Sequence, residues 1–190
     1  MAIIIVSGLP RSGTSLMMQM LQAANIPLLS DGQRVADEDN PVGYWELELV
    51  KKIKTDNSWL NNADCHGVKI ISPLMFELPD EHQYKVIVMK RAMPEVLASQ
   101  RTMMARREQQ GSSMPDTLLT KVFQQQELKL SRWLTTQDNC RFIEVHYGQL
   151  ISEPARQVDQ LIDFLQQPLN HTAMINCVDP DLYRNRQGNS

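Results

Sequence analysis

The sequence predicts an α/β fold of three layers, with a mostly parallel central sheet between two layers of helices. Four continuous apolar runs are typical of strands that are buried on both faces. Segments whose apolar residues recur at helical spacing lie between these runs, so strands and helices alternate along the chain. A glycine-bounded turn rich in hydroxyl groups joins the first strand to the first helix.

The four strands are expected where β-branched and apolar residues cluster, at Ile3–Val6, Val68–Ile71, Tyr84–Met89 and Phe142–Val145. The first helix follows the turn, because Leu16, Met17, Met20 and Leu21 fall on one helical face.

Three more helices are expected from apolar spacing and from proline in a first turn, around Val96–Met104, Asp116–Leu134 and Glu153–Leu165. Segments 30–43 and 101–115 and the tail from Asp179 onward have no such pattern. These irregular segments are the predicted walls of the functional site.

Length and composition favour one globular domain over residues 1–190. A chain of 190 residues buries about 70% of the surface that its unfolded form exposes. The sequence is 42% hydrophobic and 22% charged, which argues against disorder, collagen and coiled-coil rods. A formal charge of -3 without a long basic run argues against a nucleic-acid partner.

Cysteine usage and the apolar start bear on location. Cys65, Cys140 and Cys177 are odd in number and widely spaced, which predicts neither a disulfide framework nor a zinc site. The apolar start at Ala2–Val6 is too short for a signal peptide, and no stretch is long enough to span a membrane. We therefore expect a cytoplasmic protein without a bound metal, whose oligomeric state the sequence leaves open.

The turn after the first strand has the features of a phosphate-binding loop. Gly8 and Gly13 allow backbone conformations that bring N–H groups toward an anion, and the next helix adds the positive end of its dipole. The spacing fits the pattern G-x-x-x-x-G-K-[ST], but Thr14 stands in place of the lysine. Arg11 offers a cation from within the loop instead, with a fork that can bind two oxygens.

A second anion site is expected after the third strand. Arg91 lies at the strand's carboxyl end, which in open α/β sheets faces the ligand crevice, and Ser99 follows in the next helix. Considered without the first motif, these residues have an alternative explanation as a surface cation and a buried serine.

The stretch Pro10–Ser15 matches the loop P-R-S-G-T-[TS] of sulfotransferases that use 3'-phosphoadenosine 5'-phosphosulfate (PAPS), and the chain resembles that family from about Ile3 to Leu165. The resemblance implies a P-loop nucleoside triphosphate hydrolase-like fold. It also implies that the loop binds the 5'-phosphate through Pro10, Arg11, Ser12, Gly13, Thr14 and Ser15.

The same resemblance gives roles to residues further along the chain. Arg91 and Ser99 have the spacing of the family's 3'-phosphate ligands, although Ala92 and Met93 replace the usual Asp-Pro between them. Tyr147 follows a strand as in the family's Y-E-D-L segment and would approach the adenine.

The sequence departs from the Y-E-D-L segment at two positions, and its tail offers further cations. Gly148 and Gln149 replace the acidic pair of the Y-E-D-L segment, which leaves the role of those carboxylates unfilled or filled otherwise. Segment 183–188 could add cations to the 3'-phosphate site, with a solvated terminus as the alternative.

Sulfuryl transfer needs a cation on the transferring oxygens and a base on the acceptor. Arg11 is the predicted catalytic cation, and Glu46 is the leading candidate for the base. Glu46 lies in Asn40–Glu46, which resembles the N-P-x-G-Y-[WF]-E segment of bacterial sulfotransferase-like proteins. It could instead be a carboxylate at the start of a helix over 47–54.

Lys69 resembles a family lysine near the acceptor, with a strand lysine paired to a carboxylate as the alternative. The other candidates for the base are Asp37, Glu38, Asp39 and His66.

The function predicted on these grounds is transfer of a sulfuryl group from PAPS to a hydroxyl or amine, on a small-molecule or carbohydrate acceptor that the sequence does not identify. Two alternatives stay open. The glycine spacing also suits an ATP-dependent P-loop kinase of small molecules, against which stand the missing lysine and the absence of an acid after the third strand. The altered motifs also suit a non-catalytic homologue that binds the nucleotide without turnover.

Overall fold

A computed structural model of the chain describes residues 1–34, 36–37, 40, 43–106 and 114–179. Its centre is a five-stranded sheet, entirely parallel, in the order β2-β3-β1-β4-β5. The strands are β1 (Ala2–Gly8), β2 (Leu28–Leu29), β3 (Gly67–Lys69), β4 (Gln83–Lys90) and β5 (Cys140–His146).

The register brings several strand ends to one edge of the sheet. Gly8 at the end of β1 pairs with Met89 of β4, and Val6 pairs with Lys69 at the end of β3. Lys90 at the end of β4 pairs with His146 at the end of β5. The segments that leave these strands therefore start side by side, which is the edge where open parallel sheets bind ligands.

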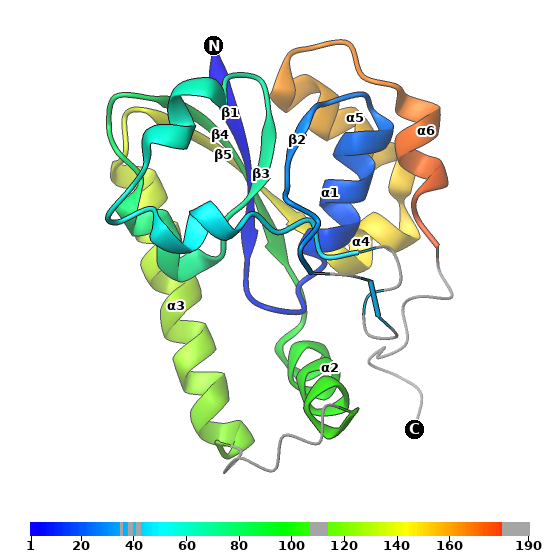
Figure 1. The fold of residues 1–190 in the computed structure, drawn as a ribbon. Helices are drawn as coiled ribbons and strands as arrows, with labels where there is room; N and C mark the ends of the chain where they lie inside the picture. The colour runs from blue at the N-terminus through cyan, green and yellow to red at the C-terminus, as the bar shows by residue number, and fades with distance from the viewer. Residues whose placement is uncertain (35, 38–39, 41–42, 107–113, 180–190) are drawn as a thin grey trace.

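Helices cover both faces of the sheet (Figure 1). One face carries α1 (Thr14–Ala23), α5 (Pro154–Leu165) and α6 (His171–Asn176), with α4 (Tyr147–Ser152) following β5 directly. The other face carries α3 (Asp116–Thr136) and three short 3-10 helices, η1 (Glu48–Lys52), η2 (Ser58–Asn62) and η3 (Ser72–Glu77). Helix α2 (Met93–Arg106) lies beyond the carboxyl edge of the strands and packs on α3.

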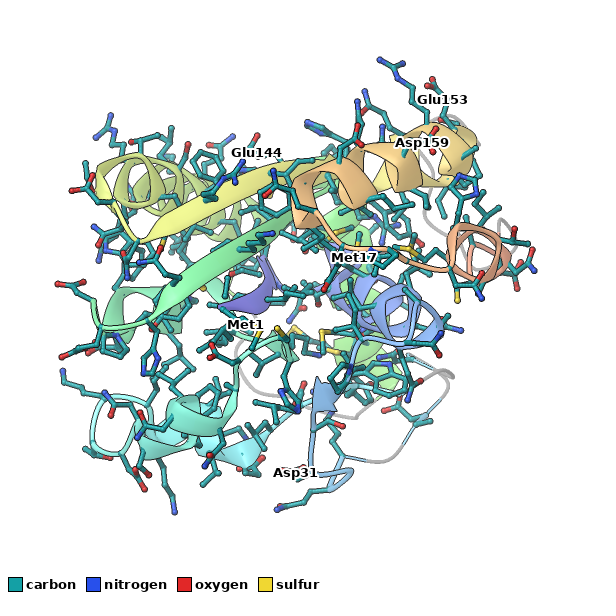
Figure 2. All side chains as sticks on the ribbon, turned by 90° about the horizontal axis from the view of Figure 1, so that it is seen from above. Met1, Met17, Asp31, Glu144, Glu153 and Asp159 are labelled. Carbon is teal, nitrogen blue, oxygen red and sulfur yellow. The ribbon has the colours of Figure 1, made fainter. Side chains whose placement is uncertain are left out.

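Each face has its own apolar core. The face of α1, α5 and α6 buries Met17, Leu21, Val158 and Leu161 against Ile4 and its neighbours in the sheet. Figure 2 shows Met17 in the interior between α1 and the sheet, whereas Asp159 lies on the outer surface of α5. A third, smaller cluster joins Leu9 to α2 and α3, so the core extends under the loop that follows β1.

The sequence-based expectations for the fold are largely confirmed. The α/β class, the parallel sheet and the four predicted strands are present, and the sheet gains a two-residue strand, β2, that its short length concealed. Helices α4 and α6 span six residues each, which is too short for a clear periodic pattern.

Three boundaries differ from the expectations. The strand expected over Val68–Ile71 ends at Lys69. Ile71 is exposed, and the next helix, η3, begins at Ser72. Segment 101–115 was expected to be irregular, but α2 continues through Arg106. The helix considered over 47–54 is the 3-10 helix η1.

Among the described residues, no helix combines the length and the apolar character needed to cross a membrane.

Candidate functional site

The loop between β1 and α1 has the backbone conformation that its glycines predict. Gly8 and Gly13 have φ angles of 148° and 100°, and Arg11, without glycine's freedom, has a φ of 68°. A methyl group on Gly8 would lie 2.6 Å from the carbonyl oxygen of Met89. The loop thus turns tightly against β4, and its sharp course holds Arg11 in a left-handed conformation.

The start of α1 adds to this loop. Gly13 caps the helix without a side-chain hydrogen bond, so no side chain from the capping residue occupies the first N–H groups of α1. Such groups, together with the helix dipole, favour an anion at this position. This local arrangement fits the phosphate of a nucleotide.

The hydroxyl groups of the loop have different partners. Ser12 is buried, and both its backbone N–H and its Oγ donate to the carbonyl oxygen of Leu9, at 3.2 and 2.7 Å. Ser15 Oγ accepts a hydrogen bond from Asn40 Nδ2 at 2.8 Å. Of the predicted phosphate ligands, Ser12 therefore closes the turn, and Ser15 ties the loop to a distant segment.

Arg11 joins the loop to α2. Its Nε donates to the Oγ of Ser99 at 2.9 Å, although 88 positions separate the two residues. Ser99 is buried in α2, and α2 starts just after β4. Two residues that were predicted from separate motifs are thus in direct contact.

Arg91 lies at the same place, and its contacts there include two hydrogen bonds and a stacked ring. Its Nη1 donates to the carbonyl oxygen of Arg11 at 3.2 Å, and its Nε donates to Glu95 Oε2 at 3.0 Å. Its guanidinium carbon lies 4.5 Å from the centre of the Tyr147 ring, a cation–π contact. The preceding residue, Lys90, instead pairs with Glu127 and Glu144, each at 3.5 Å.

Tyr147 packs closely against the loop. A methyl group on Gly13 would lie 2.4 Å from Tyr147 Cδ2, so the ring fills the space that a side chain would need. Tyr147 is buried and begins α4, directly after β5. The structure therefore brings Arg11, Gly13, Arg91, Ser99 and Tyr147 together from three separate stretches of the chain.

A second group of residues forms beside this site. Glu46 Oε1 accepts a hydrogen bond from Arg34 Nη1 at 2.8 Å and lies 3.5 Å from Lys69 Nζ. Arg34 also stacks on Tyr44, with 3.3 Å between its guanidinium carbon and the ring centre. Glu46 thus lies between two cations, one of which stacks on Tyr44.

The two groups of residues are linked. Asn40 binds Ser15 of the loop, and Lys69 ends β3 next to β1. Burial lowers the pKa of Lys69, the charge of Glu46 opposes that shift, and the charges of Arg34 and Arg11 add to it. Because Lys69 ends β3 beside β1 and lies 3.5 Å from Glu46, Glu46 lies at the same edge of the sheet as the loop.

The alternative role of Glu46 was a carboxylate at the start of a helix over 47–54, but the carboxylate in the first turn of η1 is that of Glu48. Helix η1 begins at Glu48, and the N–H of Glu48 donates to Asp31 Oδ2 at 2.6 Å. This hydrogen bond and a second one from the N–H of Gln33 lower the pKa of Asp31. The Glu46 side chain is directed to Arg34 and Lys69 instead.

The other candidates for the base lie elsewhere or have other partners. His66 precedes β3, and its carbonyl oxygen accepts from Ile4 N–H, so it lies toward the amino end of the strands, away from the loop. Both carboxylate oxygens of Asp37 accept from the Tyr44 hydroxyl, at 2.7 and 2.8 Å. Glu38, Asp39 and segment 183–188 lie outside the described residues.

Three contributors to the site did not emerge from the sequence as functional residues. Glu95 lies four positions after Arg91, the spacing of helical ion pairs, and that spacing could have revealed it. Asn40 lies within the recognised Asn40–Glu46 segment, but nothing in the sequence indicates that its side chain binds Ser15. Arg34 lies in an irregular segment, and no local pattern marks it.

Within the described part of the chain, no group of three or more His, Cys, Asp or Glu side chains could hold a metal ion.

Comparison with known proteins gives a match along nearly the whole chain. The sulfotransferase domain family matches residues 2–189. A search of curated protein sequences found no significant match.

Among solved structures, a sulfotransferase domain from the curacin biosynthetic pathway is similar with a TM-score of 0.58 and 17% identity, over 95% of this chain and 79% of that one. A sulfotransferase from Alicyclobacillus acidocaldarius has a TM-score of 0.49 and 11% identity, over 96% and 88% of the two chains. An unliganded sugar kinase from a Janibacter species has a TM-score of 0.43 and 13% identity, over 95% and 97%. The first of these supports the P-loop-like α/β fold.

Proposed function

The chain belongs to the sulfotransferase domain family, and we propose that it transfers a sulfuryl group from PAPS to a hydroxyl or amine of a small-molecule or carbohydrate acceptor. The observation that carries this proposal is the meeting of Arg11 with Ser99 and of Arg91 with the Arg11 carbonyl. Two arginines and a helix N-terminus at one sheet edge suit a nucleotide with two separate phosphates.

The donor would lie across the loop and α2. The N-terminal groups of α1 and the Arg11 side chain would bind the 5'-phosphate, and Arg91 with Ser99 would bind the 3'-phosphate. Tyr147, which already stacks on Arg91, would lie near the adenine. The features that would bind the donor lie close together, because the start of α1, Arg11 of the loop and Arg91 after β4 are in one region.

In the transfer step, the bond from sulfur to the phosphate oxygen breaks as a bond from sulfur to the acceptor oxygen or nitrogen forms. Arg11 would stabilise the charge that develops on the transferring oxygens and on the leaving phosphate. Glu46 would take the proton of the acceptor, which leaves 3'-phosphoadenosine 5'-phosphate as the second product. No step of this scheme requires a metal ion.

The acceptor would approach from the side of Glu46. Asn40 connects this segment to Ser15, and Lys69 connects it to the end of β3. Arg34 and Lys69 hold the Glu46 carboxylate in position through their ion pairs, and a carboxylate positioned beside the acceptor can take its proton.

The first experiment is calorimetric titration with 3'-phosphoadenosine 5'-phosphate beside ATP with magnesium. We expect micromolar or tighter binding of the bisphosphate and weaker binding of ATP. Preference for magnesium ATP would favour the kinase alternative. Binding of neither nucleotide would refute the donor assignment.

A screen with labelled PAPS and a broad panel of acceptors then tests turnover. Glu46→Gln should lose about 100-fold to 10,000-fold in rate once an acceptor is found, because it removes the proposed base. The matched control is Glu48→Gln, since the Glu48 side chain is partly exposed and pairs with Lys51, three positions along the same helix. Bisphosphate binding without transfer to any acceptor would favour the non-catalytic alternative.

A further inference from the structure

We propose that Glu95 is a positioning residue of the donor site, which holds Arg91 in the orientation that recognises a 3'-phosphate. Glu95 thereby sets the preference for a 3'-phosphorylated nucleotide over one that lacks this phosphate. The inference rests on the proposed function and adds a residue that the sequence motifs did not single out.

The pair formed by Arg91 and Glu95 is buried. The side chains are 8% and 5% exposed, and 3.0 Å separate Arg91 Nε from Glu95 Oε2. Two charges so far from water are tolerated when they are paired and hydrogen-bonded. Glu95 lies in the first turn of α2, where a carboxylate is also stabilised by the helix dipole.

Three of the contacts of Arg91 bear on the direction of its guanidinium. Nε points to Glu95, Nη1 points to the carbonyl oxygen of Arg11, and one face lies against Tyr147. Because a guanidinium is rigid and planar, hydrogen bonds from two of its nitrogens and a stacked ring set its plane. Glu95 supplies the charged contact of the three.

Glu95 also influences the other anion site through Arg91. The carbonyl oxygen that Arg91 binds belongs to Arg11, whose φ of 68° is costly for a residue with a side chain. The side chain of that same residue reaches Ser99. An Arg91 that turned away would therefore release the loop residue proposed to bind the 5'-phosphate.

The test compares affinities for 3'-phosphoadenosine 5'-phosphate and for adenosine 5'-phosphate, measured by calorimetry. The ratio of the two affinities reports the 3'-phosphate alone. In Glu95→Ala this ratio should fall by about tenfold, the effect of one charged hydrogen bond. In Glu95→Gln, which keeps an acceptor for Arg91 Nε–H, it should stay within about threefold of the wild-type ratio.

Glu95→Asp provides a second route to the same answer if Glu95→Ala fails to fold. It keeps the charge but shortens the side chain, so the ratio should fall as in Glu95→Ala. The NMR signal of the Arg91 Nε–H group, assigned with Arg91→Lys, gives a readout that needs no nucleotide. It should exchange slowly with water in the wild type and in Glu95→Gln, and rapidly in Glu95→Asp.

The outcomes separate this inference from the proposed function. If the wild type prefers the bisphosphate but the ratio is unchanged in Glu95→Ala and Glu95→Asp, the positioning role is refuted alone. A higher ratio in these variants also refutes it, because Glu95 would then repel the phosphate. A wild type without preference for the bisphosphate refutes the proposed donor site and this inference with it.

Discussion

Arg11 combines a left-handed backbone with a side chain that reaches another element. Its φ is 68°, and its Nε donates to Ser99 at 2.9 Å. A residue that could be glycine on conformational grounds alone is instead an arginine, which indicates that the side chain has a purpose. That purpose, in our proposal, is to bind the donor and stabilise the transferring group.

Arg11→Lys should lower turnover by about 100-fold to 1000-fold, because lysine keeps the charge but loses the forked hydrogen bonds. The measurement is the rate of labelled transfer, together with the affinity for 3'-phosphoadenosine 5'-phosphate. Arg101→Lys is the control, since Arg101 is exposed on α2 and pairs with Asp116. Rates within twofold of wild type in Arg11→Lys would contradict the assigned role.

Asn40 connects the loop between β1 and α1 to the segment that holds Glu46. It is buried, and its Nδ2 donates both to Ser15 Oγ and to the carbonyl oxygen of Gly43. A buried acceptor that loses its donor costs free energy because water cannot replace the lost hydrogen bond.

Asn40→Ala should reduce the free energy of unfolding by about 1 to 3 kcal/mol and weaken bisphosphate binding several-fold. Denaturant unfolding and calorimetry measure the two effects. Asn57→Ala is the control, because Asn57 is exposed and its side chain caps no helix. Wild-type binding by a folded Asn40→Ala variant would separate the two groups of residues functionally.

At the scale of elements, the proposed site depends on how the loop between β1 and α1 packs on α4. Tyr147 starts α4 and fills the space beside Gly13, so β5 and α4 set the position of the loop as much as β1 and α1 do. Helix α2 completes the arrangement by placing Glu95 and Ser99 on the other side of the arginines.

Gly13→Ala tests this packing. Its Cβ would lie 2.4 Å from Tyr147 at a φ of 100°, so we expect a loss of about 2 to 4 kcal/mol in the free energy of unfolding from overpacking and backbone strain. Gly32→Ala is the matched control, because Gly32 has a φ of 66° but no atom within 4 Å of the added group. Equal losses in the two variants would attribute the cost to the backbone alone.

At the scale of the whole molecule, stability at alkaline pH depends on groups buried in the sheet. Burial raises the pKa of Cys140, which begins β5, to about 11. A pKa above the unfolded value of about 9 means that folding protects the neutral thiol. The resulting stability is complete below pH 9 and is lost as the pH rises toward 11. Burial raises the pKa of Tyr84 in β4 as well, so the sheet loses stability further above this range.

Cys140→Ala should therefore flatten the decline in stability between pH 8 and pH 10.5. The wild type should lose up to about 2 kcal/mol more than the variant over this interval. Urea unfolding at the two pH values measures the difference. Parallel declines would show that folding leaves the pKa of Cys140 unchanged.

The sequence by itself determined the α/β class and the four longer strands, and it predicted which residues would form the two proposed anion sites. Those strands are continuous apolar runs, and the loop is marked by glycines at fixed spacing, so local pattern was sufficient. A parallel sheet also requires that residues at the carboxyl ends of its strands meet at one edge, which made the grouping of Arg11 with Arg91 predictable.

Only the tertiary structure decided the partners of these residues. The contacts of Arg11 with Ser99, of Asn40 with Ser15 and of Lys69 with Glu46 join positions that are far apart in the chain. In the tertiary structure His66 also lies away from the loop, and β3 ends at Lys69. Strand register, not local composition, sets the end of the sheet at which a residue lies. Local patterns fix which elements form, whereas packing between elements fixes which side chains touch.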